Sequence, residues 1–383
     1  MAHGVTWLPT FMPVATQAAI KGLTYQQMEE LGVTLILNNT YHLNLRPGMK
    51  VIQEAGGAHK FQGWRKNLLT DSGGFQLVSL SKFTKITEEG ALFASPFTGE
   101  PTLLTPEESM SIQHTIGADI IMQLDDVVPS LTTGPRVEEA MWRSVRWLDR
   151  CIAQHKKTGQ QHQNLFAIIQ GGLNEELRRI CLNEMVKRKD SVAGYAIGGL
   201  SGGEAKGPRY SMGIGFAEDL LVCIALGVDM ADCVFPTRTA RFGVALTRKG
   251  AVNLHSRNAL DLKKYRYDMD VIEEDCPCPT CRVKTSKAFL HHNIGIETAA
   301  AHALTQHNVV FQARLMGDVR DAILKDEFPI FLKNFFKTYY DDFKSYPRWI
   351  VNALRSVSVD LLEEDLSYSI LDEEGVKWDR AAK

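Results

Sequence analysis

The stretch that decides the fold reads TPEESMSIQHTIGADIIMQLDD and covers residues 105–126. Thr105 offers a capping hydroxyl, Pro106 suits the first helical turn, and the two glutamates that follow lie at the positive end of a helix dipole. We expect this helix to end at Gly117 and residues 119–124 to follow as a strand. The pattern therefore predicts a helix that leads directly into a buried strand.

The same alternation of short apolar strands and amphipathic helices recurs along most of the chain. Further strands are expected at residues 33–37, 67–70, 165–169, 195–197 and 229–234, and further helices after Gly134 and at residues 175–186 and 216–226. Repeated alternation of this kind indicates an α/β protein with a parallel sheet covered by helices, either open or closed into a barrel.

Polar and glycine residues at the ends of the strands favour the closed form. The residues that follow the strands are Asp71, Asp125, Gln170, Gly198 and Asp232. In a (β/α)8 barrel the C-terminal strand ends meet at one active-site rim, whereas an open sheet would spread them out. We therefore predict a TIM barrel.

One connection is too short for a regular barrel. Only about ten glycine-rich residues separate the strand that ends near Leu200 from the next apolar element near Tyr210, whereas a parallel crossover needs roughly a dozen or more and usually a helix. We predict that one crossover helix is missing near residues 204–210. Its loss would expose apolar sheet surface and cost several kcal/mol, on the order of half the stability of a small domain.

The chain divides into three expected parts. Residues 1–255 form the catalytic barrel, residues 256–358 a zinc-binding subdomain with closing helices, and residues 359–383 an acidic tail that we expect to be mobile.

Composition limits the class of protein. The chain has 383 residues, 44% of them hydrophobic and 23% charged, with a net charge of -2, which excludes collagen-like and wholly disordered proteins and argues against a globally basic nucleic-acid binder. No stretch is apolar for long enough to span a bilayer, and seven unevenly spaced cysteines indicate a reducing compartment. We expect a cytoplasmic enzyme, either free or associated with the mitochondrial outer surface.

Three cysteines close together predict a metal site. Cys276, Cys278 and Cys281 form a C-x-C-x2-C motif, a spacing that suits tetrahedral zinc better than a redox pair or a chance cluster. A histidine would complete a closed, structural site, and the residues alone leave four candidates, which are His291, His292, His302 and His307.

Three further motifs suggest a ligand site, although each has a plainer interpretation. Asp71 is followed by two glycines and an aromatic residue that could stack on a flat ligand, or it caps the next helix. Asp232 precedes the segment 237–241 with its two arginines, which is either a phosphate-binding loop or a solvated surface loop. The glycines after Gln170 and Ile197 either admit a ligand or form tight turns.

Taken in order, these motifs resemble the tRNA-guanine transglycosylases, or queuine tRNA-ribosyltransferases, across residues 10 to 310. The matching segments are residues 11–14, 39–43, 71–76, 125–126, 169–172, 198–204, 212–213, 232–241 and the cysteine motif. The resemblance implies an irregular (β/α)8 barrel with a C-terminal zinc-binding subdomain. It also implies replacement of guanine at the anticodon wobble position by a 7-deazaguanine base, without cleavage of the RNA chain.

The resemblance also implies roles for individual residues. Asp232 would be the nucleophile that attacks the ribose C1′, and Asp71 would be the general acid and base. Two displacements with retention require two such groups.

Asp125, Gln170 and the Gly199 backbone would read the base edge, and Phe75 and Met212 would sandwich its faces. The whole base-binding set is Ser72, Gly73, Gly74, Phe75, Asp125, Gln170, Gly199 and Met212. The RNA-binding set is Gly213, Ile214, Gly215, Phe216, Ala217, Glu218, Asp219, Thr237, Arg238, Thr239, Ala240 and Arg241. The match in spacing selects His307 as the fourth zinc ligand.

Substrate and partner follow from the same resemblance. Gly202 and Val127 leave space for queuine, as in the eukaryotic catalytic subunit, which forms a heterodimer with a non-catalytic paralogue and acts on tRNA with a G-U-N anticodon. Because Asp71 and Asp232 are both present, the chain is placed on the catalytic side. The short crossover keeps a second reading open, a non-catalytic tRNA-binding scaffold or an inactive truncated isoform. A barrel glycoside hydrolase, the third reading, gives the cysteine motif no role.

Overall fold

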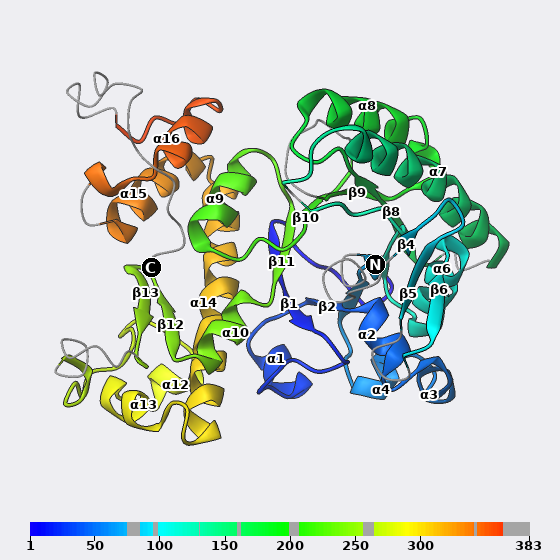
Figure 1. Ribbon diagram of the computed structural model, residues 1–383. Coiled ribbons are helices and arrows are strands. Elements are labelled where there is room, and N and C mark those ends of the chain that lie inside the picture. Colours follow the sequence, from blue (N-terminus) through cyan, green and yellow to red (C-terminus); the bar gives the residue numbers. More distant parts are fainter. Residues whose placement is uncertain are drawn as a thin grey trace.

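Eight parallel strands close into a barrel in the computed structural model (Figure 1). The structure describes residues 1–74, 85–94, 99–129, 131–158, 162–198, 207–255, 264–340 and 343–362. Around the barrel the strands are β1 (Thr10–Ala15), β11 (Met230–Cys233), β10 (Arg209–Ser211), β9 (Gly194–Ile197), β8 (Asn164–Ile169), β7 (Ile120–Met122), β3 (Asn67–Thr70) and β2 (Leu35–Asn38). The predicted (β/α)8 barrel is confirmed.

Every second side chain along each strand points into the barrel. Met12 and Val14 of β1 pack there against Phe166 and Ile168 of β8, all of them buried, while the intervening Ala167 faces the helices. Successive side chains of a strand point to opposite faces of the sheet. When both faces are covered, all of these side chains are buried, and the sequence of the strand is therefore apolar throughout. Burial of each large side chain contributes about 1.5–3 kcal/mol.

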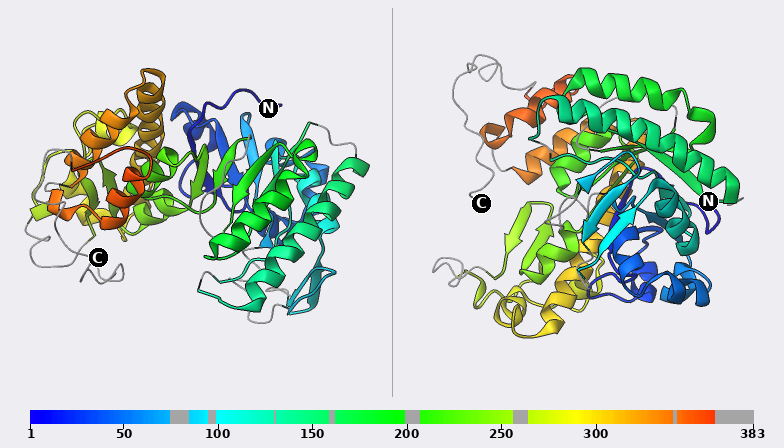
Figure 2. Two further views of the ribbon diagram at one scale, coloured as in Figure 1. Left: turned by 90° about the horizontal axis from the view of Figure 1, so that it is seen from above. Right: turned by 45° about the vertical axis from the view of Figure 1, so that its right-hand side comes forward.

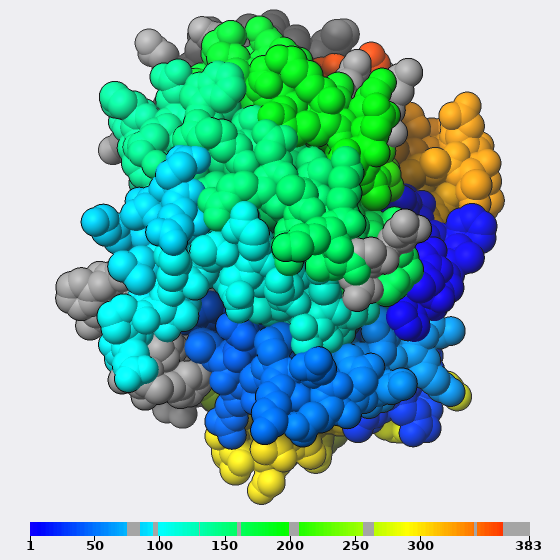
Figure 3. Space-filling view, turned by 90° about the vertical axis from the view of Figure 1, so that its right-hand side faces the viewer, coloured from blue at the N-terminus to red at the C-terminus, as the bar shows by residue number. Residues whose placement is uncertain are grey.

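Helices cover the outside of the barrel. Around the barrel lie α1 (Tyr25–Glu30), α2 (Thr40–Leu45), α3 (Met49–Glu54), α4 (Ala58–Gln62), α6 (Pro106–Ile116), α7 (Pro135–Thr158), α8 (Glu175–Val186) and α9 (Ala217–Ala225). Figure 3 shows one side of the molecule, where α7 and α8 appear in green and α2 to α4 in blue. An antiparallel sheet of β4 (Lys85–Ile86), β5 (Ala91–Ala94) and β6 (Pro101–Leu104) precedes α6. None of the helices in the described ranges combines the length and apolar composition that crossing a bilayer requires.

The helix predicted after Thr105 forms for the expected reasons. The Thr105 hydroxyl accepts a hydrogen bond from the Glu108 backbone N–H at 3.1 Å, and Pro106 occupies the first turn. Gly117 ends the helix in the left-handed conformation, with φ of 76°, which a residue with a side chain adopts at a cost.

The connection between β9 and β10 is short, yet the two strands pair in parallel. Tyr195 lies opposite Arg209 and Ala196 opposite Tyr210, so the barrel closes across this gap. The described parts of the connection, Gly198 and residues 207–208, are not helical, and residues 199–206 lie outside the described residues. The missing crossover helix therefore stays a prediction.

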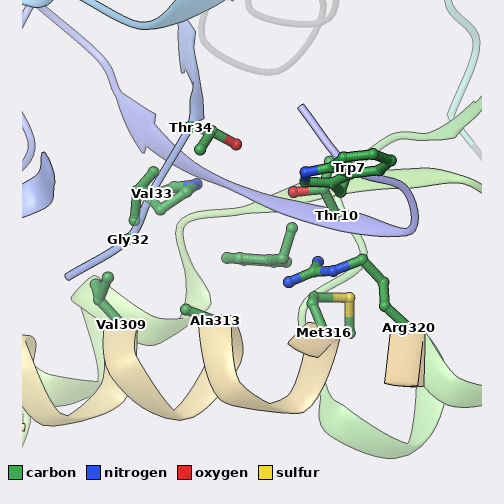
Figure 4. Close-up of a pocket in the computed structure, with 11 residues that line it drawn as sticks. Trp7, Thr10, Gly32, Val33, Thr34, Val309, Ala313, Met316 and Arg320 are labelled. Atoms are coloured by element: carbon green, nitrogen blue, oxygen red, sulfur yellow. The ribbon is translucent and has the colours of Figure 1, made fainter. Parts of the chain in front are cut away.

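The C-terminal elements lie beside the barrel, with α14 (Thr298–Leu324) between the two parts (Figures 1 and 2). Met316 and Arg320 of α14 face Trp7 and Thr10 across a small cavity of about 150 Å³ (Figure 4), and Arg320 donates to the Pro9 carbonyl at 2.9 Å. The remaining elements are α10 (Phe235–Arg241), β12 (Val244–Thr247), β13 (Gly250–Asn253), α12 (Pro279–Arg282), α13 (Lys287–Asn293), α15 (Phe328–Tyr339) and α16 (Arg348–Arg355). Residues 363–383 of the predicted tail lie outside the described residues.

Candidate active site

The C-terminal ends of the barrel strands surround a cavity of about 540 Å³. The inward-facing alternation of the core continues into this mouth: Asp71 comes two residues after Leu69 of β3, and Asp232 two residues after Met230 of β11. The cavity is lined by Val14, Thr16, Leu37, Asn39, His42, Asp71, Ser72, Asp125, Val127, Gln170, Gly198, Tyr210, Met212, Gly213, Asp232, Cys233 and Val234. The structure thus brings the predicted carboxylates into one site.

Asp232 lies on β11 with one carboxylate oxygen firmly held. The Tyr210 hydroxyl donates to Oδ1 at 2.5 Å, and the Gly213 backbone N–H donates to the same oxygen at 2.9 Å. Burial raises the pKa of Asp232 to about 6, against the two hydrogen bonds that lower it, and the nearby charge of Asp71 raises it further. At neutral pH the carboxylate is ionised, and it becomes protonated near pH 6.

Asp71 is buried in the cavity wall just after β3, where residues at the start of α2 hold its carboxylate. The Thr40 backbone N–H donates to Oδ1 at 2.8 Å, and the Asn39 amide donates to Oδ2. The Thr40 hydroxyl donates to the Asp71 carbonyl at 2.5 Å. Two carboxylates with different partners thus line the same cavity, the arrangement that a nucleophile and a separate proton-transfer group require.

A third carboxylate, Asp125, forms a hydrogen-bonded cluster on the cavity wall. Its two oxygens accept from the Ser72 hydroxyl at 2.8 Å and from the Gln170 amide at 2.7 Å. Burial raises the pKa of Asp125 to about 6, and both hydrogen bonds oppose that shift. Gly74 has no room for a side chain, because an added Cβ would lie 2.9 Å from the Asp125 carbonyl oxygen. Amide and carboxyl groups fixed on the wall can read the edge of a planar ligand.

Asp126, the next residue, points away from the cavity into an ion-pair cluster. Its fully buried carboxylate contacts Arg136 at 2.6 Å and Arg143 at 2.5 Å, both on α7. We expect Asp126→Asn to lower the free energy of unfolding by up to about 3–5 kcal/mol, because it removes the buried charge that Arg136 and Arg143 share. Buried Arg143 then keeps only the exposed carboxylates of Glu139 and Glu88 as partners. Urea denaturation at pH 7 measures the change. Glu175→Gln, which breaks the exposed pair with Arg179 on α8, should cost less than about 1 kcal/mol, and an equal loss in both variants would contradict the interpretation.

The two segments predicted to bind RNA lie side by side next to the cavity. The ring of Phe216, in the first segment, stands 4.2 Å between centroids from that of Phe235, which lies two residues before the second segment. Gly213 of the first segment lines the cavity itself, beside Met212. Of the two segments, Gly215, Ala217, Thr237 and Ala240 are buried, whereas Gly213, Phe216 and Arg238 are exposed. Buried side chains cannot contact RNA, so RNA contacts would come from the exposed members and from the half-buried ones, which are Ile214, Glu218, Asp219, Thr239 and Arg241.

The expected loop conformation of residues 237–241 is wrong, because these residues belong to the helix α10, whereas their binding to phosphate stays a prediction. Pro236 occupies the first turn, where its fixed φ favours a helix. The Thr239 hydroxyl donates to the Phe235 carbonyl at 2.6 Å, which satisfies it within the helix. Arg238 and Arg241 therefore project from one short helix.

Three predicted site residues fall outside the described residues, and two side chains of the cavity were not predicted. Phe75, Gly199 and Gly202 fall outside the described residues, so their roles stay predictions. Tyr210 and His42 line the cavity but were not assigned to the site. Alternation would have found Tyr210, because it lies two residues before Met212 on the inward face of β10.

The cysteine motif forms a buried cluster with His307 of α14. The Sγ atoms of Cys276, Cys278 and Cys281 lie 3.6, 3.5 and 3.5 Å from His307 Nδ1. A tetrahedral ion with Zn–S of about 2.3 Å and Zn–N of about 2.0–2.1 Å separates sulfur from nitrogen by about 3.5 Å, so the donors fit such an ion. His307 Nε2 contacts the Leu246 carbonyl at 2.8 Å, which orients the ring.

The other candidate histidines are engaged elsewhere. His291 contacts the Leu254 carbonyl at 2.7 Å, His292 contacts the Arg266 carbonyl at 3.1 Å, and His302 contacts the Gly22 carbonyl. Of these four histidines only His307 lies with the cysteines. The fold therefore decides which of the four histidines joins the cysteines, a choice that the residues alone left open.

Comparison with known proteins agrees with this geometry. The family profile described as queuine tRNA-ribosyltransferase matches residues 1–341. The chain belongs to this family. The expectation of an enzyme of the tRNA-guanine transglycosylase type is thereby confirmed.

Relatives of the queuine tRNA-ribosyltransferase family match nearly the full length. The chain is 53% identical to the queuine tRNA-ribosyltransferase catalytic subunit of Schizosaccharomyces pombe, over 94% of this chain and 93% of the relative. It is 46% identical to the catalytic subunit of Caenorhabditis elegans, over 92% and 93%. It is 42% identical to the queuine tRNA-ribosyltransferase of a Thermoanaerobacter species, over 88% and 92%.

Proposed function

We propose that this enzyme replaces guanine at the wobble position of tRNA with queuine by a double displacement. The observation that carries the proposal is the pair of carboxylates, Asp71 and Asp232, on one cavity of about 540 Å³ at the mouth of the barrel. A cavity of this size accommodates a purine-like base with its ribose. The names of the relatives, catalytic subunits among them, support the substrate.

In the first displacement a lone pair of the Asp232 carboxylate forms a bond to the ribose C1′. The glycosidic C1′–N9 bond breaks, its electron pair leaves with guanine, and the proton that Asp71 holds from the preceding exchange passes to the departing base. In the second displacement the Asp71 carboxylate takes a proton from N9 of queuine, which attacks C1′. The C1′–Asp232 bond then breaks, and its electron pair returns to the carboxylate.

Recognition uses groups on the cavity wall and its rim. Asp125 and Gln170 offer hydrogen bonds to the base edge, and Met212 offers an apolar surface for its face. Exposed Arg238 on α10 contributes a local positive charge toward the phosphates, which suits a chain with a net charge of only -2.

The metal, the partner and the location complete the proposal. Zinc would be held by Cys276, Cys278, Cys281 and His307, where four protein ligands leave no open position and make its role structural. We further propose tRNA with a G-U-N anticodon as substrate, a non-catalytic paralogue as heterodimer partner, and a cytoplasmic location that includes the mitochondrial outer surface.

Displacement of radiolabelled guanine from a tRNA with a G-U-N anticodon tests the proposal. Queuine is added to this chain with and without the paralogue, and release of label is followed over time. Release that depends on queuine would support the exchange. It would also mean that the enzyme is active despite the short connection between β9 and β10. No release in either setting, with metal bound and tRNA retained, would instead favour an inactive isoform.

A further inference from the structure

We propose that Tyr210 is a positioning residue for Asp232, which holds Oδ1 so that Oδ2 is the oxygen that attacks the ribose. This inference rests on the proposed function, since it gives Asp232 the role of nucleophile. Tyr210 does not need to touch the substrate, because it acts only through the carboxylate of Asp232.

The first support is the geometry of the hydrogen bonds. Tyr210 and Gly213 both donate to Oδ1, at 2.5 Å and 2.9 Å. Within the described part of the chain, no hydrogen bond to Asp232 Oδ2 is present. Two donors on one oxygen fix the carboxylate plane and leave the lone pairs of the other oxygen available in the cavity.

The second support is the rigidity of the donor. Tyr210 is 1% exposed and packs in the barrel interior on β10. It lies opposite Met230 of β11 in the strand register, so its ring reaches toward Asp232, two residues further along that strand. A side chain that is packed in the core and paired through its backbone cannot follow a moving carboxylate, so it fixes the position of Asp232.

The third support is the electrostatic setting. Burial and the charge of Asp232 raise the pKa of Tyr210 well above its ordinary value, so the phenol remains a donor throughout the working range. Among the described residues, the other titratable side chains of the cavity are Asp71, Asp125, His42 and Cys233. Among these, Asp71 raises the pKa of Asp232, whereas the Tyr210 hydrogen bond lowers it. Loss of the hydroxyl should therefore shift the titration of Asp232 upward.

The test is Tyr210→Phe, with Tyr195→Phe as a matched control. Tyr195 is a buried tyrosine on the adjacent strand β9 that faces the helices and not the cavity. Single-turnover formation of the covalent RNA adduct is measured from pH 5 to pH 8.5. The acid limb is expected to have its midpoint near pH 6 in the native enzyme, since burial raises the pKa of Asp232 to about 6, and it should move up by about one unit in Tyr210→Phe. The plateau rate should fall about tenfold or more, with KM for the RNA within about twofold, because binding contacts are kept.

Carbon-13 spectra of the aspartate carboxyls provide a readout that does not depend on catalysis. Asp232→Asn assigns the Asp232 signal, and its pKa should be higher in Tyr210→Phe than in the native protein and unchanged in Tyr195→Phe. An unchanged pKa and acid limb in Tyr210→Phe would overturn the inference, as would a uniform loss of rate that merely follows a loss of thermal stability. Absence of adduct in the native enzyme, with the Asp232 signal still shifted in Tyr210→Phe, would instead contradict the proposed function.

Discussion

Asp232→Asn is expected to abolish guanine exchange, with a loss on the order of 10⁴-fold or more. An asparagine amide nitrogen and oxygen cannot form the ester to C1′ that the first displacement requires. Its oxygen can still accept the hydrogen bonds that Tyr210 and Gly213 now donate to Oδ1. The shape of the cavity is therefore kept, and affinity for tRNA should change by less than about threefold.

Two assays on the same preparation separate these effects. Label release measures exchange, and filter binding at fixed ionic strength measures tRNA affinity. Asp229→Asn is the matched control, because Asp229 precedes β11 at the opposite end of the barrel, where it pairs with Arg209. The control should keep exchange. Exchange at the normal rate in Asp232→Asn would show that another group is the nucleophile.

The elements of the barrel were predictable because each depends on local chemistry. The helix at residues 175–186 was predicted with the limits that α8 has in the structure. Its start is marked by Asn174, whose side chain accepts from the Leu177 backbone N–H at 3.0 Å, and by two glutamates in the first turn. Six of the eight barrel strands followed in the same way from short apolar runs, since both of their faces are buried. The strand β1 was not predicted, and β10 was expected only as an apolar element near Tyr210.

The contacts that tune the site were not predictable, because they depend on register between strands. Tyr210 reaches Asp232 only because β10 and β11 pair with Tyr210 opposite Met230. The residues alone did not select His307 among the four histidines, and only the family resemblance did. It joins cysteines 26 to 31 positions away because α14 passes beside α12. The helix α10 was mistaken for a loop because its arginines and threonines suggested phosphate binding, although Pro236 favoured a helix. Local patterns thus located the carboxylates, while the fold determined their partners.

Removal of the metal is expected to destabilise the C-terminal part of the protein more than any single substitution considered above. Binding of structural zinc is worth about 10–16 kcal/mol in small zinc domains at neutral pH. Here the donors join the loop around Cys276 to α14, and the same helix carries Asn308, which bonds the carbonyls of Pro236 and Val244 at 3.0 and 2.9 Å. Because α14 also packs on β1, loss of the cluster should loosen the wall of the active site.

Cys278→Ser and chelation of the native protein should produce the same result by independent routes. Metal analysis should find about one zinc per chain in the native protein and a loss of most of it in the variant. The unfolding temperature should fall by well over 10 °C, since a few kcal/mol already moves it by that amount in proteins of moderate size. Cys223→Ser, at a half-buried cysteine of α9 outside the cluster, should retain both metal and exchange. Full thermal stability after loss of the metal would mean that hydrogen bonds of α14, such as those of Asn308, suffice to hold the subdomain, and the structural role of the ion would be wrong.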